Sequence, residues 1–458
     1  MFTILDIVKA TGGELWRGDL KKRVRGVSTD TRKIKRGDLF VAIRGDSFDG
    51  HKFVGQAVAS GAAALLVSSR DVPLEGKAAV IVVHDTVKAL GRLARYHRER
   101  FNIPLIAITG SAGKTTTKEF IASVLKSRFR VLCNAGTENN HIGVPMTLLK
   151  LRKSHEVAVL ELGTNHFGEI SWLAENARPT VAVFTNIGPS HLAGFGSPEG
   201  VLKEKLTIIE YLAKNGRIIL NADDPFLRKV LRKKLPQKVL TYAVEHRADI
   251  KAKSVSGEKG QLCFTLESGV KFRLPAPVWA NVSNALAAIA CGRLFKIGFE
   301  DMQRAIRSTK SAKGRQCFHS VGGVTIIDDT YNANPLSYKN ALKTLSILPR
   351  TGKSYLLAAD MLELGERSEE LHAEVGVLAG HSGVDKVLTI GRFARAIGDK
   401  AKEARPEIET RHFEKKEEIL STLRSEVRPW DIVLGKGSRG MHMEEVMNGL
   451  LDYLTRGN

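Results

Sequence analysis

The glycine-rich turn GSAGKTTT, which begins at Gly110, constrains this chain more than any other segment. The apolar run IPLIAIT precedes it, and the pattern that follows, TTTKEFIASVLKS, is typical of a helix. A strand, a glycine-rich turn and a helix in this order direct backbone N–H groups and a helix N-terminus toward an anion. Lys114 would then reach the terminal phosphates of a nucleotide, and the Thr115 hydroxyl would hold Mg²⁺. The segment therefore predicts a phosphate loop at the edge of a parallel sheet.

The loop is shorter than the common pattern G-x-x-x-x-G-K-[ST], because Ile108 stands where the first glycine would be. The alternative is a glycine-rich turn with an exposed lysine, but the flanking strand and helix patterns favour a phosphate loop. The loop residues predicted to bind ATP are Gly110, Ser111, Ala112, Gly113, Lys114, Thr115 and Thr116.

Short β-branched runs alternate with helical periodicity along the chain, which is typical of parallel α/β layers. Because 458 residues are too many for one core, we expect three domains. Residues 1–97 form a small N-terminal α/β domain, residues 98–311 contain the phosphate loop, and residues 312–458 repeat strand and helix as a Rossmann-like domain. Over residues 252–275 the pattern changes to hairpin-like alternation with glycine turns.

The net charge of +21 would suit a polyanionic partner. No aromatic platform or nucleic-acid-binding signature accompanies the basic residues, so we expect anionic small-molecule substrates and no nucleic acid. The four cysteines lie far apart without a C-x-x-C pair, which excludes an obvious disulfide framework or zinc site. No run of about 18 apolar residues occurs, so we expect a cytoplasmic protein without membrane insertion, and nothing requires more than a monomer.

The shortened loop T-G-x-x-G-K-T-T resembles that of the Mur ligase and folylpolyglutamate synthetase superfamily, whose ATP-dependent enzymes form amide bonds through an acyl phosphate. Similar segments cover nearly the whole chain. They are ENNHIGVP at 138–145, LELGTNHFGEI at 160–170, TNIGPSHLAGFGSPEGVLKEK at 185–205, DDTYNANP at 328–335, DMLELGERS at 360–368 and GKGSRGM at 435–441.

Within this superfamily, DDTYNANP and DMLELGE resemble the members that add D-alanyl-D-alanine to UDP-N-acetylmuramoyl-tripeptide. The motifs D-Y-A-H-T-P and D-N-P-R of the sibling ligase that adds the third amino acid are absent. The resemblance thus implies a ligase of peptidoglycan precursor synthesis whose product is UDP-N-acetylmuramoyl-pentapeptide. The alternatives are another Mur or folylpolyglutamate-type amide ligase, or a nucleic-acid-dependent P-loop NTPase.

The resemblance implies two Mg²⁺ ions, held by Thr115, Glu161, His191 and Lys205. Glu161 ends a predicted strand, where parallel sheets bind ligands, although a lone glutamate there can also be solvated or act as a cap. An ammonium cannot ligate a metal, so Lys205 is expected to carry a carbamate derived from CO₂. That reaction needs a neutral amine and hence a lowered lysine pKa. The alternatives are a surface histidine at 191, an ordinary exposed lysine at 205, and carbamylation of Lys203 instead.

The resemblance also implies that ATP binds between the second and third domains. Arg315 is expected to approach the transferred phosphate, although an arginine in a linker commonly faces solvent, and Asp329 is expected to bind the ribose. Closure of the split site would exclude water from the reactive intermediate. The predicted catalytic residues are Lys114, Lys205, Arg315 and His191.

Two segments depart from the family pattern. Asn281 and Asn284 match the helix on the adenine side, but Val278 and Ala280 replace a glycine and a histidine that are usual there. Thr137 stands where the family often has an asparagine. The adenine contacts are therefore less firmly indicated than the phosphate contacts.

The first domain is expected to bind the UDP-sugar, through STDTRKIKRGDLFVAIRG and FDGHKF. Its basic residues would attract a pyrophosphate and a peptide with several carboxylates, or they form a solvated basic face. The asparagines of ENN are candidates for hydrogen bonds to substrate, or they simply form a turn. The predicted substrate-binding residues are Ser28, Thr29, Asp30, Arg32, Asp49, Gly50, His51, Asn139 and Asn140.

Overall fold

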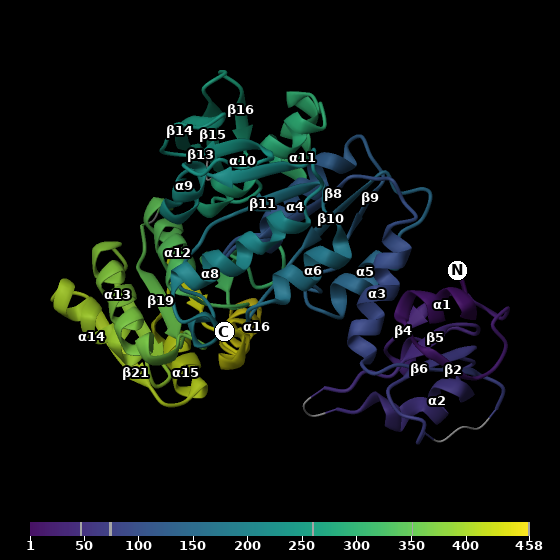
Figure 1. Ribbon diagram of the computed structural model, residues 1–458. Helices are drawn as coiled ribbons and strands as arrows, with labels where there is room; N and C mark the ends of the chain where they lie inside the picture. The colour runs from purple at the N-terminus through teal and green to yellow at the C-terminus, as the bar shows by residue number, and fades with distance from the viewer. Residues whose placement is uncertain (46–47, 73–75, 259–260, 350, 457–458) are drawn as a thin grey trace.

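The structure is a computed structural model that describes residues 1–45, 48–72, 76–258, 261–349 and 351–456. Figure 1 shows three α/β lobes in chain order, with the second lobe between the first and the third. This confirms the predicted α/β class and the three-domain architecture, while the boundaries after residues 97 and 311 stay predictions. In the described part of the chain, no helix is both long and apolar enough to cross a membrane.

The first lobe has a five-stranded sheet in the order β2-β7-β6-β5-β4, in which only the pairing of β2 is antiparallel. Its strands are β2 (Glu14–Arg17), β4 (Val27–Ser28), β5 (Leu39–Val41), β6 (Ala64–Val67) and β7 (Ala79–Val82). A two-stranded ladder joins β1 (Phe2–Thr3) to β3 (Arg23–Val24). The helices are α1 (Ile4–Thr11), α2 (Val54–Ala59) and α3 (Thr86–Arg98).

The second lobe has a nine-stranded sheet in the order β16-β15-β14-β13-β12-β11-β8-β10-β9. The parallel strands are β8 (Leu105–Thr109), β9 (Val131–Cys133), β10 (Val157–Glu161), β11 (Val181–Phe184), β12 (Arg217–Asn221) and β13 (Lys238–Ala243). The antiparallel extension predicted from residues 252–275 is formed by β14 (Ile250–Glu258), β15 (Gln261–Leu266) and β16 (Lys271–Arg273). The first glycine turn of that extension, at Gly260, lies outside the described residues.

Helices cover both faces of this sheet, which explains why β8 is apolar at successive positions. Ile106 and Ile108 pack in one cluster with residues of α4 (Lys114–Lys126) and α10 (Ala280–Leu294), whereas Leu105 and Ala107 belong to the cluster on the other face. The remaining helices are α5 (Gly143–Leu148), α6 (Glu169–Ala177), α7 (Leu192–Phe195), α8 (Pro198–Leu206), α9 (Pro225–Leu231) and α11 (Phe299–Ser308). Burial on both faces makes this sheet a rigid support for the loops at its edge.

The third lobe has a six-stranded sheet in the order β17-β18-β22-β19-β20-β21, parallel except for β17. Its strands are β17 (Cys317–Val321), β18 (Val324–Asp329), β19 (Ser354–Ala359), β20 (Lys386–Ile390), β21 (Glu409–Phe413) and β22 (Ile432–Lys436). Its helices are α12 (Pro335–Ile347), α13 (Ser368–His381), α14 (Arg395–Ala404), α15 (Lys416–Glu426) and α16 (Glu444–Thr455).

The first lobe is joined to the second by a close helix contact. Gly91 of α3 lies against the ring of Trp172 on α6, and a Cβ at this glycine would lie only 2.3 Å from Cζ2 of the tryptophan. A side chain at position 91 would therefore push the two helices apart. On the same side, Arg95 of α3 forms an ion pair with Glu175 of α6 at 2.8 Å.

Candidate active site

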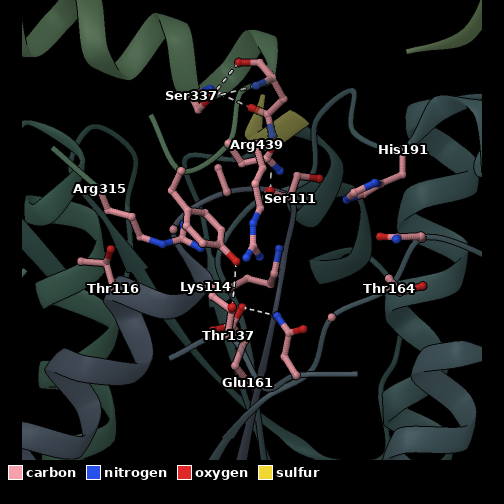
Figure 2. A pocket seen from close by; sticks show the side chains of 18 of the residues that line it. Ser111, Lys114, Thr116, Thr137, Glu161, Thr164, His191, Arg315, Ser337 and Arg439 are labelled. Atoms are coloured by element: carbon pink, nitrogen blue, oxygen red, sulfur yellow. Dashed lines mark hydrogen bonds between the residues drawn. The ribbon is translucent and has the colours of Figure 1, made fainter. Parts of the chain in front are cut away.

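A cavity of about 720 Å³ lies where the second and third lobes meet. Its walls come from the phosphate loop, the loops after β10 and β11, the start of α10, and the segments around β18 and β22. Figure 2 shows several of the side chains that reach into it. The predicted site residues among its lining are Ser111, Ala112, Gly113, Lys114, Thr116, Asn139, Asn140, Glu161, His191, Asn281, Asn284, Arg315 and Asp329.

Internal contacts hold the phosphate loop in shape. Gly110 has φ 151°, and a Cβ there would lie 1.9 Å from Oγ1 of Thr185, so the loop requires glycine at this position. Asn186 accepts a hydrogen bond from the backbone N–H of Ala112 at 2.8 Å, and Lys114 Nζ donates to the carbonyl of Gly110 at 2.9 Å. The loop is therefore preorganised as a cradle for an anion, with its lysine folded back over it.

Thr115 and Glu161 meet beneath this loop, one from the start of α4 and the other from the end of β10. The Thr115 hydroxyl donates to Oε2 of Glu161 at 2.7 Å, and Asn139 Nδ2 donates to Oε1 at 2.7 Å. Both Thr115 and Glu161 are almost fully buried. The predicted pair of oxygen ligands is thus in direct contact.

Lys205 is buried on α8, whereas Lys203 is exposed. Burial moves the pKa of the Lys205 amine well below its ordinary value, and the charge of Lys114 lowers it further. Within the described residues, Lys205 Nζ forms no hydrogen bond. This lowered pKa favours the neutral form that carbamylation requires.

His191 follows β11 and touches the third lobe through Glu363. The pKa of His191 is lowered overall. Burial and the charges of Lys114 and Lys205 lower it, whereas the hydrogen bond with Glu363 raises it. His191 and Lys114 both line the cavity, whereas Lys205 does not. Among the described residues, no three His, Cys, Asp or Glu side chains form a metal cluster by themselves.

Tyr331, which the sequence did not single out, connects the second and third lobes. Its hydroxyl donates to Oγ1 of Thr137 at 2.7 Å, so the unusual threonine has a partner across the domain boundary. The guanidinium carbon of Arg315 lies 4.2 Å from the centre of the Tyr331 ring, and that of Arg439 lies 5.6 Å from it. One aromatic ring therefore supports two arginines in the cavity.

Asp329 is already paired in this structure. Lys436 Nζ donates to Oδ2 of Asp329 at 2.8 Å and to the carbonyl of Asn332 at 3.1 Å. Burial raises the pKa of Asp329, against the opposing effect of Lys436. Sequence reasoning missed Lys436, although it belongs to the segment GKGSRGM that carried part of the resemblance.

Asn281 and Asn284 lie at the start of α10, directly beside the phosphate loop. Asn284 Oδ1 accepts from the Thr117 hydroxyl at 3.0 Å, and its Nδ2 donates to Oδ1 of Asn281 at 3.2 Å. A Cβ at Gly113 would lie 2.7 Å from Asn284 Oδ1. The helix that the sequence assigned to the adenine side therefore packs against the loop that would hold the phosphates.

The residues predicted to bind the UDP-sugar lie in the first lobe and do not line the cavity. Asp30 caps a short helical turn and pairs with Arg32, whose hydrogen bonds lower the pKa of Asp30 to about 2. Asp49 caps the turn that begins at Gly50 and bonds His51. Ser28 accepts from the backbone of Asp30 at 3.2 Å. With the half-buried Thr29, these residues form local turns near the ends of β4 and β5.

A phosphate loop that faces a second α/β lobe across a cavity defines a three-domain P-loop protein. Residues 23–98 match the Mur ligase family catalytic domain, residues 108–292 the Mur ligase middle domain, and residues 314–439 the Mur ligase glutamate ligase domain. The chain belongs to the Mur ligase family.

Curated relatives match along the whole chain. The UDP-N-acetylmuramoyl-tripeptide–D-alanyl-D-alanine ligase of Bacillus subtilis is 37% identical, and alignment covers 98% of each chain. The ligase of the same name from Escherichia coli is 36% identical over 99% of each chain. Among solved structures, MurF from Acinetobacter baumannii has a TM-score of 0.89 at 33% identity, covering 98% of this chain and 99% of that one. MurF ligase from Thermotoga maritima in complex with ADP has a TM-score of 0.85 at 30% identity, covering 95% and 99%.

Proposed function

We propose that this protein joins D-alanyl-D-alanine to UDP-N-acetylmuramoyl-tripeptide at the expense of ATP, giving UDP-N-acetylmuramoyl-pentapeptide, ADP and phosphate. The observation that carries this proposal is the phosphate loop in the cavity between the second and third lobes. The relatives that match along the full length of the chain are named for this reaction, which supports it.

Amide formation from a carboxylate requires that one carboxylate oxygen become a leaving group. Transfer of the ATP γ-phosphoryl group to the tripeptide carboxylate achieves this and gives an acyl phosphate and ADP. The amine of D-alanyl-D-alanine then attacks the acyl carbon, and the tetrahedral adduct expels phosphate. Such chemistry depends mainly on positioning and on neutralising negative charge. Lys114 and Arg315 are two cations of the cavity lining that we assign to this purpose.

The residues present fit a magnesium site. Thr115 and Glu161 supply oxygen atoms, which Mg²⁺ prefers, and they already lie within 2.7 Å of each other. We propose that they hold Mg²⁺ together with His191 and a carbamylated Lys205. When bound, the ions neutralise charge on the phosphoryl group during its transfer. The buried, unbonded amine of Lys205 and its lowered pKa support the carbamate.

Contacts between the second and third lobes would exclude water from the acyl phosphate. Tyr331 bonds Thr137, and Glu363 contacts His191, so two contacts hold the third lobe against the second. Contacts of this kind would limit the access of water to the intermediate and so protect it from hydrolysis.

A coupled assay of ADP release tests the proposal. The rate should rise only when UDP-N-acetylmuramoyl-tripeptide and D-alanyl-D-alanine are both present, and mass spectrometry should show the pentapeptide product. Lys114→Met should lower turnover about 100-fold or more, because a cation at the transferred phosphate is lost. Lys126→Met is the matched control, because Lys126 lies exposed at the end of the same helix. ADP release stimulated by oligonucleotides and not by the two peptide substrates would contradict the proposal.

A further inference from the structure

Arg439 is a cation of the cavity that the proposed reaction has not yet used. It follows β22 in the third lobe, its side chain is exposed, and it lines the cavity. Lys114 bonds its own loop and Lys436 pairs with Asp329, whereas Arg439 has no acidic partner within the described ranges. An unpaired guanidinium in a binding cavity is a site for an anion.

Arg439 and Arg315 approach the cavity from different segments, and Figure 2 shows them entering in different directions. Arg315 precedes β17 and lines the cavity together with Lys114 and Asp329, the residues proposed to contact ATP, so we assign it to the nucleotide side. Arg439 instead lies next to Ser438, whose hydroxyl accepts from the backbone N–H of Leu362 at 2.9 Å. Arg439 is therefore anchored beside the DMLELGE segment of the third lobe.

The side chain of Arg439 is also positioned by the aromatic ring it shares with Arg315. Its guanidinium lies 5.6 Å from the centre of the Tyr331 ring, and Tyr331 is fixed by its bond to Thr137. A guanidinium held on a ring loses less conformational freedom when it binds an anion. Contact with the Tyr331 ring therefore positions Arg439, like Arg315, before an anion binds.

The incoming dipeptide has a chemical requirement that Arg439 meets. Its amine must reach the acyl carbon, and its carboxylate then lies about 7 Å away along an extended chain of two residues. Closure of the lobes around the substrates would bury that carboxylate, which is costly unless a cation pairs with it. The planar fork of a guanidinium matches the two carboxylate oxygens.

We propose that Arg439 binds the carboxylate of the incoming D-alanyl-D-alanine and makes the enzyme select dipeptides with a free carboxyl terminus. This inference rests on the proposed function, because it assigns the part of the cavity that receives the second substrate. Arg315 remains with the transferred phosphate, and the Tyr331 ring lies next to both arginines.

The test compares two dipeptides in two proteins. D-alanyl-D-alaninamide has the same attacking amine and nearly the same shape as D-alanyl-D-alanine, but it has no terminal charge. In the unmodified protein, kcat/KM for the acid should exceed that for the amide about 10- to 150-fold, as expected for a charge-assisted pair. In Arg439→Met this ratio should fall to about 1, while KM for ATP stays the same.

Arg424→Met is the matched control, because Arg424 lies on a tyrosine ring of the same lobe, 5.4 Å from the centre of Tyr453, and does not line the cavity. It should keep the preference for the acid. ADP affinity measured by calorimetry shows whether each variant retains a folded nucleotide site. If Arg439→Met lowers the melting temperature, Arg439→Gln takes its place, and the ratio is again expected to fall to about 1.

Two results would overturn the assignment of Arg439 and leave the proposed function standing. One is an unchanged ratio of kcat/KM for the acid to kcat/KM for the amide in the folded, active Arg439→Met variant. The other is a loss of activity in this variant that appears as a raised KM for ATP. If the unmodified protein forms product with neither dipeptide, the proposed function fails, and the assignment of Arg439 fails with it.

Discussion

Replacement of Lys436 by methionine should destabilise the third lobe strongly. The lysine side chain is 1% exposed and that of Asp329 is 11% exposed, with 2.8 Å between Nζ and Oδ2. Removing one partner of a buried pair leaves an uncompensated charge and costs about 3–5 kcal/mol of the free energy of unfolding. For a domain of this size, that corresponds to a decrease of about 10 °C or more in melting temperature.

Differential scanning calorimetry at several pH values tests this reasoning. Burial raises the pKa of Asp329 in the folded state above that in the unfolded state. The free energy of unfolding therefore decreases as the pH rises from the unfolded-state pKa to the folded-state pKa of this carboxyl. The penalty of Lys436→Met should therefore be largest at neutral pH and shrink on acidification, because a protonated Asp329 needs no lysine partner.

Two further variants complete the experiment. The double variant Lys436→Met/Asp329→Asn should recover most of the lost stability, because no buried charge remains. Lys416→Met is the control: Lys416 pairs with Glu445 at the surface at 2.8 Å, and its loss should cost about 1 kcal/mol or less. An unchanged melting temperature in Lys436→Met, or a double variant no more stable than the single one, would refute the reasoning.

Variants at three other positions test further parts of the structure. Tyr331→Phe removes the hydroxyl bridge to Thr137 but keeps the ring, so calorimetry should show ADP affinity reduced about 2- to 13-fold, and an unchanged affinity would contradict the bridge. Lys205→Ala should reduce turnover about 100-fold or more by removing the proposed carbamate ligand. ¹³C NMR with labelled bicarbonate should show a carbamate in the unmodified protein, and an unmodified lysine in the active ATP-bound form would refute the proposal. Gly91→Ala should cost about 1–3 kcal/mol through its clash with Trp172, and Gly91→Ala/Trp172→Leu should recover part of this in thermal unfolding; equal stability of Gly91→Ala and the unmodified protein would be incompatible with the contact.

Much of the fold could be predicted because its signals are local. The phosphate loop is read from a contiguous strand, turn and helix, and the buried runs of β8, β10 and β18 indicate parallel sheets. The hairpin extension after residue 250 is likewise recognised from alternation within a short segment. Such features depend on neighbours in the chain, and no knowledge of the tertiary structure is needed to propose them.

The contacts between lobes could not be predicted in the same way. Thr137 and Tyr331 are 194 positions apart, and neither residue type by itself indicates that their hydroxyls meet. Lys436 was missed for the same reason, since a lysine in a glycine-rich segment is commonly exposed and only burial beside Asp329 makes it a partner. The resemblance to a family pointed to the right segments but not to these pairs.

By itself, the sequence determined the phosphate loop, the alternation of strands and helices, and the residue types available for phosphate and metal chemistry. Only the tertiary structure decided that the Lys205 amine lies buried near the charge of Lys114, that Asp329 is paired, and that two arginines contact one ring. The physical reason is that chain connectivity and hydrogen bonding between near neighbours specify local conformation. Burial, shifted pKa values and pairing across domains arise only when distant segments exclude water together.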